Sequence, residues 1–151
     1  MDNTPKIRDT FRRRDALKIE PVTLPATAAT VYSDTEALEE SIDLYPLTAK
    51  GARLEDMELN ISIPDLTVAQ MVDADTLTFS ILTDSVRPID ASSTVVAGDC
   101  FVCTGAGGVG VGPLNHRFKI PSDCQRYIGV KIVHAGTGSP ETAEAITELL
   151  F

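Results

Sequence analysis

The stretch Thr76-Leu77-Thr78-Phe79-Ser80-Ile81 places an apolar side chain at every second position, between small polar ones. Successive side chains of a β-strand point to opposite faces of the sheet, so this spacing puts Leu77, Phe79 and Ile81 on one face. β-branched and aromatic residues suit such a half-buried, pleated surface. The stretch therefore predicts a strand with one face in a hydrophobic core.

The same alternation recurs on both sides of this stretch. It predicts further strands at residues 59–63, 94–96, 100–104, 115–120 and 126–134. Turn residues separate them, among them Ala97-Gly98-Asp99 and Pro121-Ser122-Asp123. Short strands at roughly ten-residue spacing, with no long helical stretch among them, indicate a sandwich, barrel or jelly roll. The fold class that we expect is all-β, with the sandwich domain over residues 46–151.

The N-terminal part of the chain shows no sustained period. Pro5, Pro21 and Pro25 interrupt residues 1–45, together with a run of small residues at 26–30. We interpret residues 1–45 as an extended, partly basic arm that precedes the sandwich. Arms of this kind usually become ordered only against a partner.

The C-terminal segment fits two structures equally well. Ser139-Pro140-Glu141 has the residues of a helix start, with an N-cap, a proline at the first helical position and an acid in the first turn. Residues 143–151 also alternate in the way that a closing strand would. From the residue pattern alone, both a helix and a strand remain open.

The charge is unevenly distributed along the chain. The whole chain carries a net charge of −9, but residues 1–18 carry +3 and the remainder −12. The negative charge of residues 19–151 would repel the phosphate backbone of a nucleic acid, which argues against a nucleic-acid partner. The basic residues of the arm are the candidate partner-binding residues, either for an acidic protein surface or as a solvated end without a role. They are Arg8, Arg12, Arg13, Arg14 and Lys18.

The composition disfavours several other classes of protein. Tryptophan is absent and aromatic residues make up 5%, which argues against a stacking platform for bases or sugars. The first residues lack the apolar segment of a secretion signal, and no apolar run is long enough to span a bilayer. We therefore expect synthesis in the cytoplasm and no membrane partner. The odd set of cysteines, at positions 100, 103 and 124, favours reduced thiols over disulfides.

Two motifs have the spacing of functional sites, but each has a simpler explanation. Cys100-Phe101-Val102-Cys103 has C-x-x-C spacing, yet positions i and i+3 of a strand point to opposite faces, so a metal or redox site is disfavoured. The glycine-rich stretch at residues 105–110 formally matches a dinucleotide-binding loop. Val111-Gly112-Pro113 then blocks the helix that such a loop needs, and a surface loop between strands is favoured. We expect no catalytic residue, no metal and no cofactor.

The chain from about Leu59 to Phe151 resembles a known family. Residues 119–130 read Lys119-Ile120-Pro121-Ser122-Asp123-Cys124-Gln125-Arg126-Tyr127-Ile128-Gly129-Val130, and the chain ends with a glycine turn and the small-apolar segment 143–151. This pattern, an apolar-Pro-x-x-x-x-Arg-Tyr-apolar hairpin followed by two strands, resembles small phage capsid proteins of the Bordetella-phage cement type. The stretch from Thr76 to Thr83, ending in Asp84-Ser85, resembles the family's preceding strand. The basic N-terminus and residues 100–113 depart from the family pattern.

The resemblance implies a jelly-roll-like β-sandwich that decorates the outer surface of a bacteriophage capsid. Such a subunit forms a homo-oligomer, with a dimer favoured over a trimer, and clamps neighbouring major capsid proteins, so its place is the virion surface. The resemblance also implies that the final segment is a strand. The alternatives are a receptor- or glycan-binding sandwich of a phage tail or fibre, which should expose aromatic residues, and a cupin-like enzyme. The enzyme should cluster histidines, whereas the chain has only His116 and His134.

Overall fold

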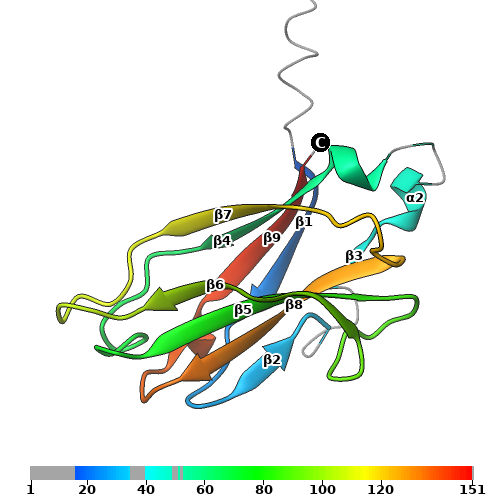
Figure 1. Ribbon diagram of the computed structural model, residues 1–151. Coiled ribbons are helices and arrows are strands. Elements are labelled where there is room, and N and C mark those ends of the chain that lie inside the picture. The colour runs from blue at the N-terminus through cyan, green and yellow to red at the C-terminus, as the bar shows by residue number, and fades with distance from the viewer. Residues whose placement is uncertain (1–15, 35–39, 49–50, 52, 151) are drawn as a thin grey trace, which may run out of the picture.

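The computed structural model describes residues 16–34, 40–48, 51 and 53–150. Two antiparallel sheets face each other and form a β-sandwich (Figure 1). The strands are β1 (Ala16–Thr23), β2 (Thr30–Tyr32), β3 (Ile42–Asp43), β4 (Glu58–Ile63), β5 (Thr76–Asp84), β6 (Thr94–Thr104), β7 (Leu114–Lys119), β8 (Tyr127–Ala135) and β9 (Glu144–Leu150). Helical structure is limited to α2 (Tyr45–Thr48) and the 3-10 turns η1 (Leu54–Asp56) and η2 (Pro140–Thr142) within the described residues.

The strand order brings distant parts of the chain together. One sheet has the order β1-β9-β4-β7, and the other has the order β2-β8-β5-β6, with β3 also pairing with β8. Both β2 and β3 pair with β8, at Val133 and Ile128 respectively, so the two short strands follow one another along the same edge. The all-β class predicted from two-residue alternation is confirmed, and the two sheets form a sandwich, one of the three architectures that the alternation left open.

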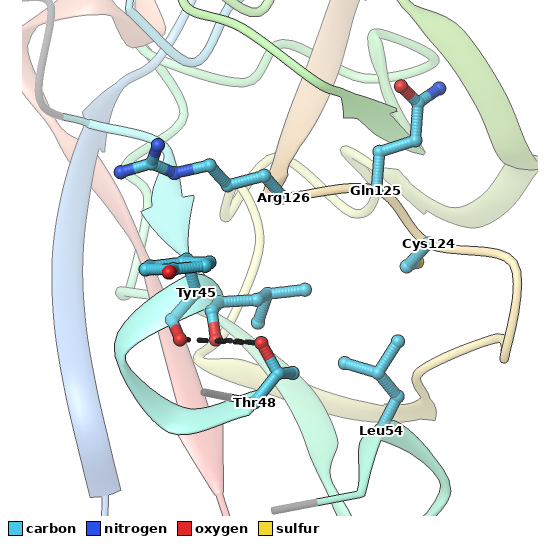
Figure 2. Close-up of a pocket in the computed structure, with 7 residues that line it drawn as sticks. Tyr45, Thr48, Leu54, Cys124, Gln125 and Arg126 are labelled. Carbon is cyan, nitrogen blue, oxygen red and sulfur yellow. Dashed lines mark hydrogen bonds between the residues drawn. The ribbon is translucent and has the colours of Figure 1, made fainter. Parts of the chain in front are cut away.

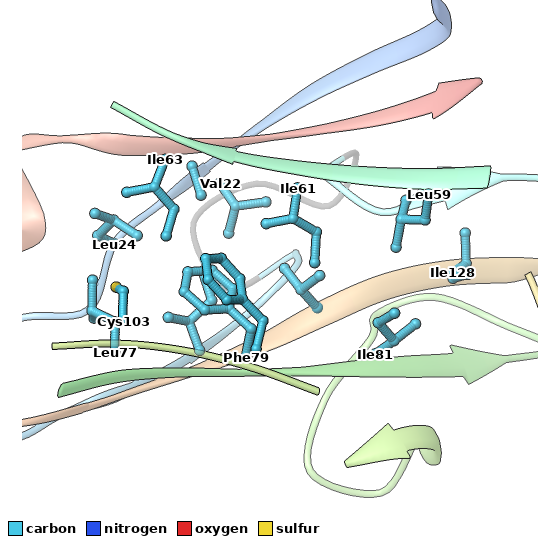
Figure 3. Close-up of a cluster of buried hydrophobic side chains, with 14 of the residues drawn as sticks. Val22, Leu24, Leu59, Ile61, Ile63, Leu77, Phe79, Ile81, Cys103 and Ile128 are labelled. Carbon is cyan, nitrogen blue, oxygen red and sulfur yellow. The ribbon is translucent and has the colours of Figure 1, made fainter. Parts of the chain in front are cut away.

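The core lies between the two sheets and is built from the alternating apolar positions. Phe79 and Ile81 of β5 face Leu59 and Ile61 of β4 across the sandwich, and all four are almost fully buried (Figure 3). The Phe79 ring stacks on that of Phe101, with centroids 5.1 Å apart. Interdigitated side chains of this kind supply most of the stabilising free energy of a sandwich.

The described residues of the segment 16–45 include three strands of the two sheets, β1, β2 and β3. β1 pairs with β9 from Ala16 to Thr23, with one register shift between Ala16 and Lys18, although Pro21 lies within it. A proline is tolerated here because β1 is an edge strand, whose outer backbone groups need no partner. The prolines therefore led to the prediction of an extended arm at a place where the structure has a strand. The arm predicted for residues 1–45 does not extend through Ala16–Thr23. Residues 1–15 lie outside the described part of the chain.

The segment 94–104 forms one strand where the sequence predicts two. Ala97-Gly98-Asp99 was expected to be a turn, but the pairing of β6 with β5 continues past it with two shifts of register. Asp99 has a positive φ of 44°, and its backbone N–H donates to Ser80 Oγ at 2.9 Å. The turn-forming residues thus make β-bulges, which absorb extra residues in an edge strand without ending it.

The C-terminal segment is a strand, as the resemblance implied. β9 lies between β1 and β4 in the centre of its sheet, so its backbone is paired on both sides. The predicted helix start at Ser139-Pro140-Glu141 forms only the short 3-10 turn η2, which ends at Thr142. Ala145, Thr147 and Leu149 then face the core on alternate positions. Tertiary pairing overrides the local helix propensity.

Candidate interaction surface

An alternating set of arginine and tyrosine side chains lies at one end of the sandwich. The guanidinium carbon of Arg126 lies 5.1 Å from the ring centroid of Tyr45 and 4.9 Å from that of Tyr127. Arg87 lies 4.8 Å from the centroid of Tyr127. These residues come from three separate segments, namely the start of α2, the loop after β5 and the start of β8. We call this set, together with Asp43, the Arg–Tyr surface.

Asp43 fixes the direction of the Arg126 side chain. Arg126 donates two hydrogen bonds to it, from Nε to Oδ1 at 3.1 Å and from Nη2 to Oδ2 at 2.9 Å. The backbone N–H of Tyr45 also donates to Asp43 Oδ1, at 3.0 Å. The hydrogen bond from Arg126 lowers the pKa of Asp43 below its ordinary value, against the opposing effect of burial. A bidentate pair of this kind holds the planar guanidinium group in one orientation.

Ser41, whose backbone is bonded to the buried carboxylate of Asp34, positions Arg87. Arg87 donates from Nε to Ser41 Oγ at 2.9 Å and from Nη2 to the Ser41 carbonyl oxygen at 2.6 Å. The backbone N–H groups of Ser41 and Ile89 in turn donate to the two oxygens of Asp34, at 2.8 and 2.9 Å. Asp34 therefore links the backbone of Ser41 to that of Ile89, which lies two residues after Arg87.

An open, mainly apolar cavity of about 280 Å³ lies beside Arg126 and Tyr45 (Figure 2). Its lining residues are Leu44, Tyr45, Thr48, Leu54, Cys124, Gln125 and Arg126. The Thr48 hydroxyl is turned inward and bonds to the carbonyl oxygens of Leu44 and Tyr45, which leaves its methyl group available for apolar contact. Tyr45 remains 58% exposed at the rim. The arrangement can receive an apolar or aromatic group from a partner.

All three cysteines are free thiols, with Cys103 buried and Cys100 and Cys124 partly buried. Burial raises the pKa of Cys103 and of Cys124 to about 11, and it also raises the pKa of Cys100. The Cys100 thiol donates to the carbonyl oxygen of Phe79, whereas Cys103 belongs to the hydrophobic core. Within the described ranges, no group of three or more His, Cys, Asp or Glu residues is placed to hold a metal ion.

The two histidines lie at different places in the sandwich. His116 is exposed on the edge strand β7, and its ring packs on Phe101 with centroids 4.1 Å apart. His134 is buried and contacts Asp75, with 3.4 Å between His134 Nε2 and Asp75 Oδ2. The structure therefore does not bring His116 and His134 together. Asp65 and Asp73 are exposed, and Asp84 and Asp90 accept hydrogen bonds from serines of the loop 85–93.

The glycine-rich loop joins β6 to β7 and is packed at its base. Leu66 and Val111 exchange backbone hydrogen bonds of 2.8 and 2.9 Å. Gly110, at a φ of +82°, lies so close to Leu66 that an added Cβ would be 2.0 Å from its carbonyl oxygen. The tip of the loop is exposed, with Val109 at 76%. No helix follows the loop, so the structure offers no helix N-terminus to a pyrophosphate.

The basic residues predicted to bind a partner fall mostly outside the described part of the chain. This applies to Arg8 and to Arg12, Arg13 and Arg14. Lys18 belongs to β1, where it pairs with Leu149 of β9. Sequence reasoning did not select the Arg–Tyr surface, although Arg126 and Tyr127 stand in the segment that carries the family resemblance. One feature of the sequence could have indicated this surface: the chain has three tyrosines, and two of them, Tyr45 and Tyr127, belong to it.

None of the helices in the described segments is long and apolar enough to cross a membrane. The sequence matches no protein-family model, and no curated protein matches it significantly. The function is therefore argued from the fold, the Arg–Tyr surface and the sequence pattern.

Proposed function

We propose that this protein is a capsid decoration protein, which binds the outer surface of a phage head and stabilises the assembled shell by bridging major capsid proteins. The observation that carries the proposal is the Arg–Tyr surface beside the apolar cavity. It is built around Arg126 and Tyr127, the same residues that carry the resemblance to phage cement proteins. The jelly-roll topology, the homo-oligomer with a dimer favoured over a trimer, and the place on the virion surface belong to the proposal.

The composition of the Arg–Tyr surface supports a role in binding another protein. Arginine and tyrosine are the residues most enriched, with tryptophan, at the centres of protein interfaces. Asp43 and Ser41 already hold Arg126 and Arg87 in place, so little side-chain entropy is lost when a partner binds. The cavity beside them offers a pocket for an anchoring side chain.

The proposed mechanism is differential affinity and needs no reaction. A subunit that binds the assembled shell more tightly than its free components stabilises the shell by the free energy of binding. Because one head has many equivalent binding sites, a modest free energy of binding per copy adds up to a large stabilisation of the shell. In an oligomer, contacts to separate capsid subunits also raise the effective concentration of each remaining contact. The basic residues Arg8, Arg12, Arg13, Arg14 and Lys18 provide a second, electrostatic contact in this proposal.

Co-sedimentation with undecorated heads tests the proposal. Heads prepared without this protein should carry it into the pellet, and Arg126→Ala should weaken binding by about tenfold or more, as expected for an interface arginine worth at least 1.4 kcal/mol. Arg117→Ala is the matched control, because Arg117 is an exposed arginine on β7, in the other sheet. Equal binding by the two variants would reject the Arg–Tyr surface, and no binding by the unmodified protein would reject the function.

The exposed ring of Tyr45 favours one alternative, a receptor- or glycan-binding module of a phage tail or fibre. An aromatic face beside polar side chains can stack on a sugar ring, and here Gln125 lies on the same cavity. Screening the protein against immobilised glycans distinguishes the two functions. Saturable glycan binding that Tyr45→Ala abolishes, without binding to heads, would favour the alternative.

A further inference from the structure

Within the described residues the two sheets have four edges, and three of them carry features that hinder pairing with another chain. β1 contains Pro21, which lacks a backbone donor, and the edge formed by β2 and β3 is interrupted, since these strands have three and two residues. β7 presents the exposed charges of Arg117 and Lys119. The fourth edge is β6, and its register shifts affect only the part that pairs with residues 79–82 of β5.

The part of β6 that follows these shifts is a regular and uncharged strand edge. Residues 100–104 read Cys-Phe-Val-Cys-Thr, and Phe101 to Thr104 pair with β5 without interruption. Phe101 and Cys103 are buried in the core, whereas Val102 is 50% exposed on the outer face. Among the strands that the structure describes, β6 pairs with β5 alone, so the backbone groups on its other side are available to a further strand (Figure 1). A free edge without charges favours pairing with another chain.

Two copies of this edge are complementary to each other. Antiparallel pairing centred on Val102 places this residue opposite Val102 of the second copy, on the outer face of both sheets. Phe101 then stands opposite Cys103 on the core side. Every pair within residues 100–104 joins uncharged side chains, so no like charges meet there although each chain carries a net charge of −9. A strand that pairs with itself about a two-fold axis gives a closed dimer rather than a longer array.

We propose that residues 100–104 of β6 are the surface through which two copies of this chain pair, edge to edge and antiparallel. The inference rests on the homo-oligomer that belongs to the proposed function, and it assigns a surface to that contact. Pairing joins the two sheets that contain β6 into one continuous sheet across the dimer. The paired segment is only about 17 Å long for five residues. The contact is therefore smaller than a standard interface, and the dimer is weak.

Sedimentation equilibrium of the full-length chain, from about 10 µM to about 1 mM, measures the dissociation constant of a weak dimer. Val102→Lys places two like charges directly opposite each other and should raise this constant roughly fivefold. Val95→Lys is the matched control. Val95 is 54% exposed on the same strand, but it lies on the other side of the register shifts, so this variant should keep the constant of the parent.

Oxidative cross-linking tests the position of the two-fold axis. Opposite residues of an antiparallel pair have Cβ atoms about 5 Å apart, close to the separation that a disulfide spans. Val102→Cys in the full-length chain should therefore form a covalent dimer joined at position 102 under mild oxidation, and Val95→Cys should not. Non-reducing electrophoresis and peptide mapping identify the product.

A parent that remains monomeric up to about 1 mM would overturn the proposal. Equal dissociation constants of Val102→Lys and the parent would also overturn it, as would equal cross-linking of the two cysteine variants. Open-ended oligomers would contradict it too, because the two-fold contact closes at two copies. These results do not depend on phage heads. A monomeric protein that still binds heads would therefore reject this inference alone, and a dimer that does not bind heads would reject the proposed function alone.

Discussion

His134 of β8 and Asp75, the residue before β5, form a buried pair, with His134 Nε2 3.4 Å from Asp75 Oδ2. Their side chains are 0% and 5% exposed. The other ring nitrogen, Nδ1, lies 3.2 Å from the carbonyl oxygen of Ala26, which can only accept a hydrogen bond. Asp75 further accepts the backbone N–H groups of Thr137 and Gly138 at 3.1 and 2.7 Å. The pair therefore joins three loops at one end of the sandwich.

The first prediction concerns acid stability. Burial raises the pKa of Asp75, but the backbone hydrogen bonds and His134 outweigh it, so the pKa lies below its ordinary value of 3.8. A depressed pKa stabilises the fold fully above the unfolded-state value, and this contribution is lost as the pH falls through the folded-state value. The free energy of unfolding can be measured by urea denaturation from about pH 2.5 to about pH 6, where carboxylates titrate. We expect it to decrease as the pH is lowered below about 4.

The variant Asp75→Asn should be less stable at neutral pH by about 1–3 kcal/mol, because its amide nitrogen replaces a carboxylate oxygen and leaves a buried backbone N–H group without an acceptor. Its free energy of unfolding should also depend less steeply on pH in the acid range. Asp65→Asn, at an exposed position, is the control and should follow the parent. If Asp75→Asn and the parent had parallel pH profiles, Asp75 would not be the carboxylate responsible.

The second prediction concerns the base of the glycine-rich loop. Gly110→Ala should destabilise the fold by about 2 kcal/mol or more, because the new Cβ meets the Leu66 backbone and the residue has a positive φ. Gly112→Ala, two residues along the same loop, has open space around the new Cβ and should be nearly neutral. Thermal unfolding of both variants checks this difference. Similar melting temperatures would mean that the loop is not anchored to Leu66.

The third prediction concerns thiol reactivity. With a pKa of about 11, Cys103 and Cys124 are thiolates to roughly one part in a thousand at pH 8, far less than an exposed cysteine. Alkylation by iodoacetamide at this pH should therefore be slow at both positions in the folded protein and fast in urea. Peptide mapping by mass spectrometry resolves the sites. Rapid modification of Cys124 in the folded protein would show that its thiol is more accessible than its packing indicates.

The fourth prediction concerns truncation at the N-terminus. A deletion of residues 1–15 should leave the melting temperature nearly unchanged, because β1 begins at Ala16. A deletion of residues 1–18 removes the start of β1, including the pairs that Ala16 and Lys18 make with β9, and should lower it. Differential scanning calorimetry of the two truncated chains measures the difference. Equal melting temperatures would mean that the first residues of β1 add no stability.

Much of the fold was predictable from two-residue alternation, for a physical reason. Strands β4, β5 and β8 bury apolar side chains at alternate positions, and this pattern can be read from the sequence; β7 shows it only weakly, because none of its side chains is fully buried. β1 was missed because an edge strand tolerates Pro21, and β6 was divided because Gly98 and Asp99 form bulges as readily as turns. In both cases the deciding factor was the neighbouring strand, which local sequence does not reveal.

The candidate site was less predictable than the fold. Asp43, Tyr45, Arg87 and Arg126 are far apart in the sequence and meet only because β3 and β5 both pair with β8. The sequence reasoning selected the concentrated charge of Arg12, Arg13 and Arg14, since a run of like charges is visible without a fold. A site that is assembled from single residues on several strands becomes visible only after the sheet order is known.

The proposed function makes a direct claim about phage heads, namely that the bound protein stabilises the assembled shell. Differential scanning calorimetry of undecorated heads, with and without saturating protein, measures this claim. The proposal predicts that added protein raises the disruption temperature of the heads, and that Arg126→Ala requires a higher concentration for the same rise. A disruption temperature that stays unchanged at saturating protein would contradict the role as a decoration protein.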